Sequence, residues 1–203
     1  MYNSFSLFEK NIEQTKELSS LYQYLESTIT SPLSFDDILR SKIVYSVSAF
    51  DKLMHDLIRI GIVDTFAGNR SPTPKYLSDP ITLNLHNQLV AATIPPKEFY
   101  FEQAIFNKLK VISYQDPSKI SDGLSYIWDE KQKWKKIAEG MTRPEDSVKT
   151  KLKLIASRRN TIVHEADIDP LTNKKYSINV ADCESTTDFL YACGKEIYNK
   201  VSG

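Results

Sequence analysis

The sequence predicts an all-α protein that folds as a helical bundle. Glycine is scarce, with six in 203 residues, and apolar residues recur at spacings of three and four along most of the chain. No segment makes a compelling strand, because the best candidate, residues 175–180, is too short. A single domain is expected over residues 1–203. The predicted helices cover residues 4–29, 35–66, 81–92, 98–114, 122–138, 145–166 and 179–201.

The first two predicted helices are long and amphipathic. Phe5 and Phe8 begin the apolar face of the first, and the Ser31-Pro32 pair ends it. Ser34 can cap the second helix, and the two aspartates that follow suit its positive N-terminal end. The apolar stripe of the second helix comprises Phe35, Ile38, Leu39, Ile43, Val47, Phe50, Leu53, Met54, Leu57 and Ile58.

The helical pattern is interrupted after the second helix. Three prolines and a glycine fall within residues 67–80, and Pro95-Pro96 ends the short helix at 81–92. We therefore expect an irregular insertion around residues 67–97.

Turn residues separate the remaining helices. Trp128 and Trp134 belong to the helix at 122–138, and we interpret them as packing residues rather than platforms for base stacking. Pro144 precedes the next helix, and Asp169-Pro170 begins the turn before the last one.

The composition is that of an ordinary globular protein. Hydrophobic residues make up 41% and charged residues 26%, and no window approaches the ~18 consecutive apolar residues that a membrane-spanning helix needs. The first residues lack the basic and apolar regions of a secretory signal. Cys183 and Cys193 fall on one predicted helix about 15 Å apart, too far to form a disulfide with each other. A reducing, cytoplasmic location without a membrane partner is therefore expected.

Charge is balanced over the chain but not along it. The sequence holds 26 basic and 26 acidic residues, yet residues 131–159 carry ten bases and three acids. Such a stretch suits a polyanion, and Lys149 and Lys153 are the candidate RNA-binding residues within it. The alternative is a solvated helix face rich in lysine.

Most catalytic signatures are missing from the sequence. No Cys/His cluster has the spacing of a zinc site, and no GxxxxGK[ST], GxGxxG or GxSxG pattern occurs. We therefore expect no metal and no cofactor. One polar constellation remains, the segment SRRNTIVHEAD at residues 157–167.

Three side chains of this segment suit phosphodiester chemistry. Asn160 and His164 are four residues apart and lie on one helix face, and the long side chain of Arg159 can fold towards them. An imidazole exchanges protons near neutral pH, and a guanidinium binds phosphate and offsets charge in the transition state. The alternative is a surface network in which Arg158 pairs with Asp167 or Glu165.

The RNTIVH motif at residues 159–164 resembles the signature of the HEPN superfamily, most closely its RiboL-PSP type. SAFDKLMHDL at residues 48–57 supports the likeness. The resemblance implies a helical bundle and a metal-independent ribonuclease that works as a homodimer. It makes Arg159, Asn160 and His164 the candidate catalytic residues. Arg158 has five residues between it and the histidine, so it could share the role.

Two further residues lie outside the motif. Asp51 and His55 are four residues apart on the second predicted helix, and the simplest interpretation is a partly buried salt bridge. The functional interpretation makes them auxiliary, with Asp51 facing the motif helix and orienting Arg159 or His164.

These observations favour an endoribonuclease that cleaves RNA by attack of the ribose 2′-OH. The resemblance places such proteins in phage defence, toxin–antitoxin pairs and RNA processing, so an antitoxin is a possible partner. Two alternatives stay open: a non-catalytic module that binds RNA or a nucleotide, and a helical partner of a nucleotidyltransferase.

Overall fold

A computed structural model describes residues 1–30, 32 and 34–202 of the protein, and these residues form an all-α bundle, which confirms the predicted fold class. Apart from helices, the described residues contain one isolated antiparallel bridge, between Ile168 and Lys175. Ser31, half of the predicted Ser31-Pro32 break, lies outside them. The helices are α1 (Tyr2–Thr28), α2 (Asp36–Phe66), α3 (Pro74–Ser78), α4 (Leu83–Ala91), α5 (Lys97–Leu109), α6 (Pro117–Leu124), α7 (Lys133–Gly140), α8 (Glu145–His164) and α9 (Val180–Val201).

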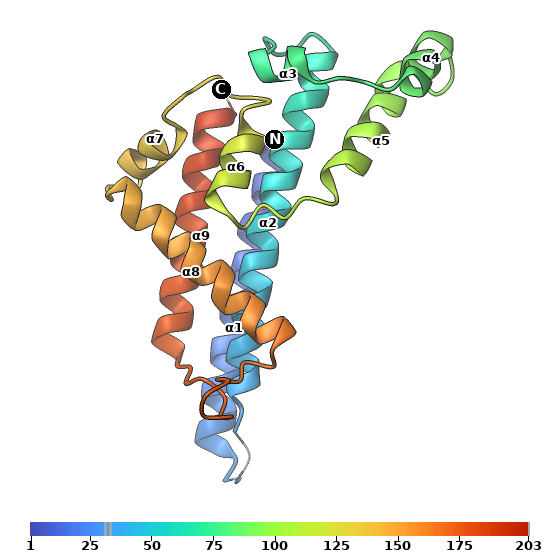
Figure 1. Ribbon diagram of the computed structural model, residues 1–203. Coiled ribbons are helices and arrows are strands. Elements are labelled where there is room, and N and C mark those ends of the chain that lie inside the picture. Colours follow the sequence, from blue (N-terminus) through green and yellow to red (C-terminus); the bar gives the residue numbers. More distant parts are fainter. Residues whose placement is uncertain (31, 33, 203) are drawn as a thin grey trace.

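Helix α2 is the centre of the bundle. It runs beside α1 and α9 and also contacts α5, α6 and α8 (Figure 1). The N-cap position is Phe35 rather than the predicted Ser34, although Ser34 Oγ accepts a hydrogen bond from the backbone N–H of Asp36, the first helical residue (3.1 Å). Because α2 touches so many neighbours, it can present different faces to the core and to a functional site.

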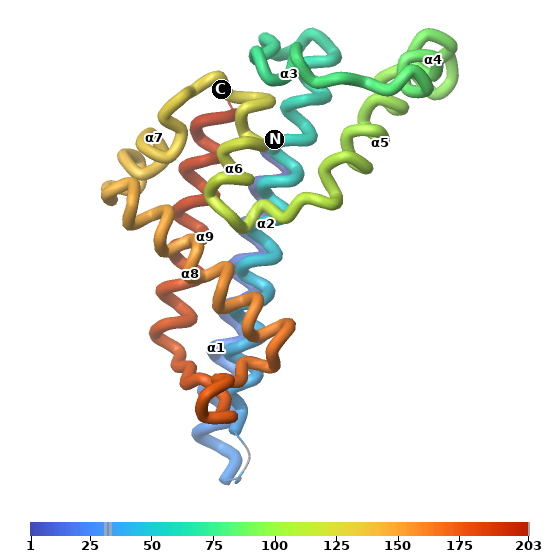
Figure 2. Tube along the Cα trace, viewed as in Figure 1, coloured from blue at the N-terminus to red at the C-terminus, as the bar shows by residue number. Residues whose placement is uncertain are grey.

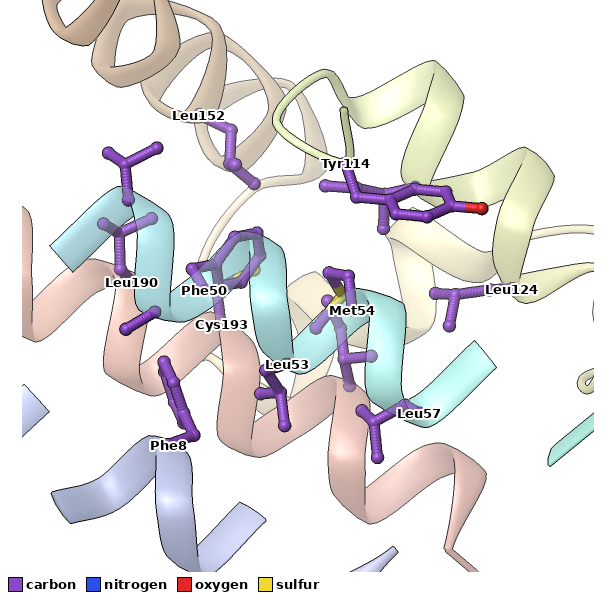
Figure 3. Packing of buried hydrophobic residues seen from close by; sticks show 14 of the residues in the cluster. Phe8, Phe50, Leu53, Met54, Leu57, Tyr114, Leu124, Leu152, Leu190 and Cys193 are labelled. Atoms are coloured by element: carbon purple, nitrogen blue, oxygen red, sulfur yellow. The ribbon is translucent and has the colours of Figure 1, made fainter. Parts of the chain in front are cut away.

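The core forms around the apolar stripe of α2. Phe50, Leu53 and Met54 are almost fully buried, and Figure 3 shows them on α2 beside Leu190 and Cys193 of α9, with Phe8 of α1 close by. Each such side chain contributes roughly 1.5–3 kcal/mol through burial. Gly194 of α9 makes the close approach possible, because a Cβ there would lie 2.8 Å from the Phe8 ring.

The predicted interruption at residues 67–97 contains the short helices α3 and α4. Thr73 and Thr82 cap them by accepting backbone hydrogen bonds at 3.1 Å. Helix α4 packs on α5, and together they project from the bundle as an arm (Figure 2). From the tip of the arm, α5 leads back to the bundle and contacts α2.

The single helix predicted at 122–138 is wrong, because two helices occupy this region. Helix α6 begins earlier, at Pro117, where Asp116 caps it by accepting a backbone hydrogen bond (2.8 Å). It ends after Gly123, whose missing Cβ leaves room for Tyr114: a Cβ there would lie 2.5 Å from that ring. Tertiary packing therefore sets this boundary.

Other boundaries differ less from the predictions. Helix α5 ends at Leu109 rather than at residue 114. Helix α8 ends at His164 rather than 166, because Ala166 and Asp167 have left-handed backbones with φ of 52° and 61°. The packing interpretation of Trp134 agrees with the structure, since it is buried.

Candidate functional site

Helix α8 carries the RNTIVH motif and orients it through its apolar face. Val148, Leu152 and Ile155 are buried and recur at spacings of four and three, so they fix the rotation of the helix against the bundle. Arg159 follows Ile155 by four residues and therefore continues the inward-facing stripe. Its side chain consequently points towards α2 rather than into solvent.

An open cavity of about 570 Å³ lies where α2, α5 and α8 meet. Arg159 is the only residue of α8 in its lining, and residues of α2 and of the last turn of α5 form the walls. Four of the lining side chains are basic and two are acidic, which favours an anionic ligand. The lining residues are Ser48, Asp51, Lys52, His55, Asp56, Arg59, Phe106, Leu109, Lys110, Gln115 and Arg159.

The Arg159 guanidinium is incompletely bonded. Its Nη1 donates to Oδ1 of Asn160 (3.1 Å), while the buried Nε has no hydrogen-bond partner among the described residues. A buried donor without an acceptor costs about 1–3 kcal/mol. An acceptor supplied by a ligand would recover that cost, and a phosphate oxygen suits a guanidinium best.

Asp51 and His55 lie in the same cavity as Arg159. His55 Nε2 is 3.9 Å from Asp51 Oδ2, and its ring stands edge-on to Tyr114, with centroids 4.7 Å apart. Asp51 Oδ1 accepts the backbone N–H of Tyr114 (2.5 Å), which holds the segment between α5 and α6 against α2. The structure thus contains the partly buried pair and places it in one cavity with Arg159, with no hydrogen bond from Asp51 to Arg159 or His164 among the described residues.

The surroundings of Asp51 perturb its ionisation. Burial raises the pKa of its carboxyl above the ordinary aspartate value. Positive charge on His55, the Tyr114 N–H and the Arg159 guanidinium each oppose that rise. Arg159 is therefore close enough to Asp51 to act on it electrostatically, across the space where the cavity opens.

His164 is oriented differently from Arg159. His164 is five positions after Arg159, which amounts to about 140° around the helix axis at ~100° per residue. His164 is exposed at the end of α8 and does not line the cavity. Within the part of the chain that the structure describes, it makes no hydrogen bond or ion pair with Arg159 or Asn160. One chain therefore brings Arg159 together with Asp51 and His55, and leaves His164 facing solvent.

Arg158 has a different environment from its neighbour. It pairs with Asp167 (Nη1–Oδ1 2.7 Å, Nη2–Oδ2 2.8 Å), which is 0% exposed. Arg40 of α2 donates to the same carboxylate through Nε (2.6 Å) and to the Tyr176 carbonyl through Nη2 (2.8 Å). The alternative pairing of Arg158 with Asp167 is thus present, and this ionic cluster fastens the end of α8 to α2.

The candidate RNA-binding lysines lie earlier on α8. Lys149 pairs with Glu145 (3.2 Å) one turn away, and Lys153 is exposed. Neither residue lines the cavity beside Arg159. They would extend a basic surface along α8 and do not belong to the pocket itself.

Several cavity residues were not among the sequence candidates. Lys52 and Arg59 could have been found, because α2 has a polar stripe at spacings of three and four opposite its apolar one. Phe106 and Lys110 carry no such signal, since only the path of α5 past α2 brings them to the site.

Two features are absent from the described residues. No group of three or more His, Cys, Asp or Glu side chains there is arranged to hold a metal ion. Among the same residues, no helix has both the length and the apolar character to cross a membrane.

Comparison with known proteins places the chain in a family. No curated protein and no solved structure matches it. A family model described as RiboL-PSP-HEPN matches residues 9–202, a range that includes the motif, the cavity and most of α1. The match spans far more than half of the chain. The protein is therefore a member of the RiboL-PSP-HEPN family, a group within the HEPN superfamily.

Proposed function

We propose that the protein is a metal-independent endoribonuclease that cleaves RNA at the cavity beside Arg159. The observation that carries the proposal is the buried Arg159 Nε, a donor that finds no acceptor among the described residues, in a cavity with more basic than acidic side chains. A backbone phosphate of RNA supplies the missing acceptor. Membership of the HEPN superfamily supports a role in RNA binding or cleavage.

The proposed reaction is an internal transesterification. One His164 imidazole removes the proton of the ribose 2′-OH, and the 2′-oxygen attacks the phosphorus. Arg159 stabilises the added negative charge as the bond to the 5′-oxygen breaks. An imidazolium returns a proton to that oxygen, so the products are a 2′,3′-cyclic phosphate and a 5′-OH. Asn160 holds the Arg159 guanidinium through its amide oxygen.

We propose that the active form of the protein is a homodimer. A single chain offers one His164, and that residue faces solvent rather than its own cavity. A second copy docked on the end of α8 would bring both exposed His164 imidazoles into one cleft at the dimer interface, next to the Arg159 cavities, so that one acts as base and the other as acid. Light scattering at micromolar concentration should give twice the mass of the chain. Full activity from a monomer would contradict this assignment.

The role of His164 is tested by its substitution with alanine. His164→Ala should lower the rate of RNA cleavage by about 10²–10⁴-fold, the usual contribution of a general acid–base group. His86→Ala is the matched control, because His86 is an exposed histidine on α4 outside the cavity, and it should keep the wild-type rate. The assay contains EDTA and identifies the chemical ends of the products.

Two results would contradict the proposal. One is a wild-type rate in His164→Ala. The other is a rate that EDTA abolishes and magnesium restores, since the proposal assigns acid, base and charge stabilisation to side chains alone.

The second candidate is a non-catalytic module that holds RNA or a nucleotide in the same cavity. The observation that favours it is the separation of His164 from Arg159 within one chain. It predicts RNA binding that depends on Arg159 with no cleavage at any protein concentration.

A further inference from the structure

The cavity extends well beyond Arg159. Its α2 wall runs from Ser48 to Arg59, which is about three helical turns or ~16 Å. Its volume of about 570 Å³ falls within the range typical of small-molecule sites. A single phosphate at Arg159 would leave most of this space empty, so the cavity has room for the sugar and base attached to that phosphate.

The distribution of ion pairs shows where an anion can bind. Lys52 is paired with Asp56 (2.9 Å), and Arg59 is paired with Glu102. Lys110 donates only to the neutral amide of Asn107 (2.9 Å). Of the basic lining residues, only Lys110 and Arg159 lack a carboxylate partner within the described chain. The positive charge that no carboxylate pairs with therefore lies just after the end of α5 and on α8, on two walls of the same cavity.

An aromatic ring lies on the α5 wall. Phe106 lines the cavity with 52% of its surface exposed, one turn before Lys110, and the buried Leu109 lies between them in sequence. An exposed ring beside a free cation is suited to a nucleobase, because every base has a face that can stack. Gln115, which also lines the cavity, has an amide that can donate to or accept from a base edge.

We propose that this cavity is a nucleotide subsite, in which the base next to the scissile phosphate stacks on Phe106 and Lys110 contacts a neighbouring phosphate. The inference rests on the proposed function and deepens it, since it names the part of the RNA that the chain recognises. It makes Phe106 a binding residue that contributes to affinity and not to the chemical step.

The test is a calorimetric titration of the intact protein with the four nucleoside 5′-monophosphates. Phe106→Leu keeps an apolar side chain but removes the ring, and should weaken binding about tenfold. Phe106→Tyr keeps the ring and should bind like the wild type. Phe99→Leu is the matched control, because Phe99 is 46% exposed on the same helix but does not line the cavity, and it should bind unchanged.

Inorganic phosphate is titrated alongside the nucleotides. It should bind at least several-fold more weakly than they do, because it has no base to stack. Equal binding of phosphate and nucleotide would overturn the inference, and so would equal nucleotide binding by Phe106→Leu and wild type. Circular dichroism checks that each variant is folded. If Phe106→Leu is unfolded, Lys110→Gln replaces it as the test, because Lys110 is exposed. Lys110→Gln should weaken nucleotide binding several-fold.

RNA cleavage is measured separately, so that the two proposals can fail independently. Phe106→Leu should raise KM for RNA about tenfold with little change in kcat, since stacking is equal in the ground and transition states. Nucleotide binding through Phe106 by a protein that cleaves no RNA would leave the subsite standing and refute the ribonuclease. If Phe106→Leu changes neither RNA cleavage nor nucleotide binding, the subsite is refuted and the proposed ribonuclease activity still stands.

Discussion

Arg158 and Arg159 are neighbours in sequence but lie in opposite kinds of site. Arg158 belongs to an ionic cluster in which the buried carboxylate of Asp167 forms ion pairs with both Arg158 and Arg40. Arg159 lines an open cavity, pairs with no carboxylate among the described residues and has a buried Nε that bonds to nothing there. The two side chains are identical, and a single residue of helical rotation gives them different surroundings.

The difference shows that neighbouring residues of the motif segment have separate roles, one in stability and one at the cavity. A buried carboxylate that is paired with arginines stabilises a fold, and a guanidinium that pairs with no carboxylate in a cavity is available to a ligand. The cluster closes the end of α8, where Thr161 O accepts the N–H groups of Glu165 and Asp167 (both 3.0 Å). Arg158 thereby fixes the helix end that carries His164, and Arg159 faces the cavity.

The largest effect on stability is expected at the cluster. Asp167→Asn removes the charge that compensates two arginines but tolerates the left-handed backbone, so it should lower the free energy of unfolding by about 3–5 kcal/mol. Asp37→Asn is the control, because Asp37 is the exposed partner of Arg40, and it should cost less than about 1 kcal/mol. Urea denaturation measures both. Similar losses in the two variants would mean that the cluster is not structural.

A smaller effect on the free energy of unfolding is expected at Asp51 in the cavity, and this effect depends on pH. Burial raises the folded-state pKa of Asp51, so the stability it contributes is fully present below its unfolded pKa of about 3.9. That contribution is lost as the pH rises through the raised folded-state pKa. Asp51→Asn keeps an acceptor for the Tyr114 N–H but cannot ionise. The variant should therefore gain stability relative to wild type as the pH rises from acid to neutral, and a constant difference would contradict the assignment.

Much of the fold could be predicted from the sequence, because apolar spacing and helix stop signals are local. Helices α2, α8 and α9 lie within two residues of their predicted ranges. The division between α6 and α7 could not be predicted, since tertiary contacts hold the segment between them: Thr73 Oγ1 donates to the Ser125 carbonyl and Arg70 Nη1 to the Ile127 carbonyl (both 2.8 Å).

The candidate site could be predicted only in part. The RNTIVH pattern identified Arg159 and His164 as candidates, yet the spacing does not reveal which arginine faces the core. That choice follows from Ile155, whose burial sets the rotation of α8. Phe106 and Lys110 reach the cavity through the path of a distant helix, which no local pattern contains.

The paired substitutions Arg159→Lys and Arg158→Lys test the division of roles most directly, with cleavage rate and free energy of unfolding measured for both. Lysine keeps the charge but loses the planar fork. Arg159→Lys should lose about 10²–10³-fold in rate, the usual cost of removing a transition-state donor, with stability within about 0.5 kcal/mol of wild type. Arg158→Lys should lose roughly 1–2 kcal/mol of stability but retain the rate of the folded protein. A wild-type rate in Arg159→Lys, with the loss of activity in Arg158→Lys instead, would contradict the account.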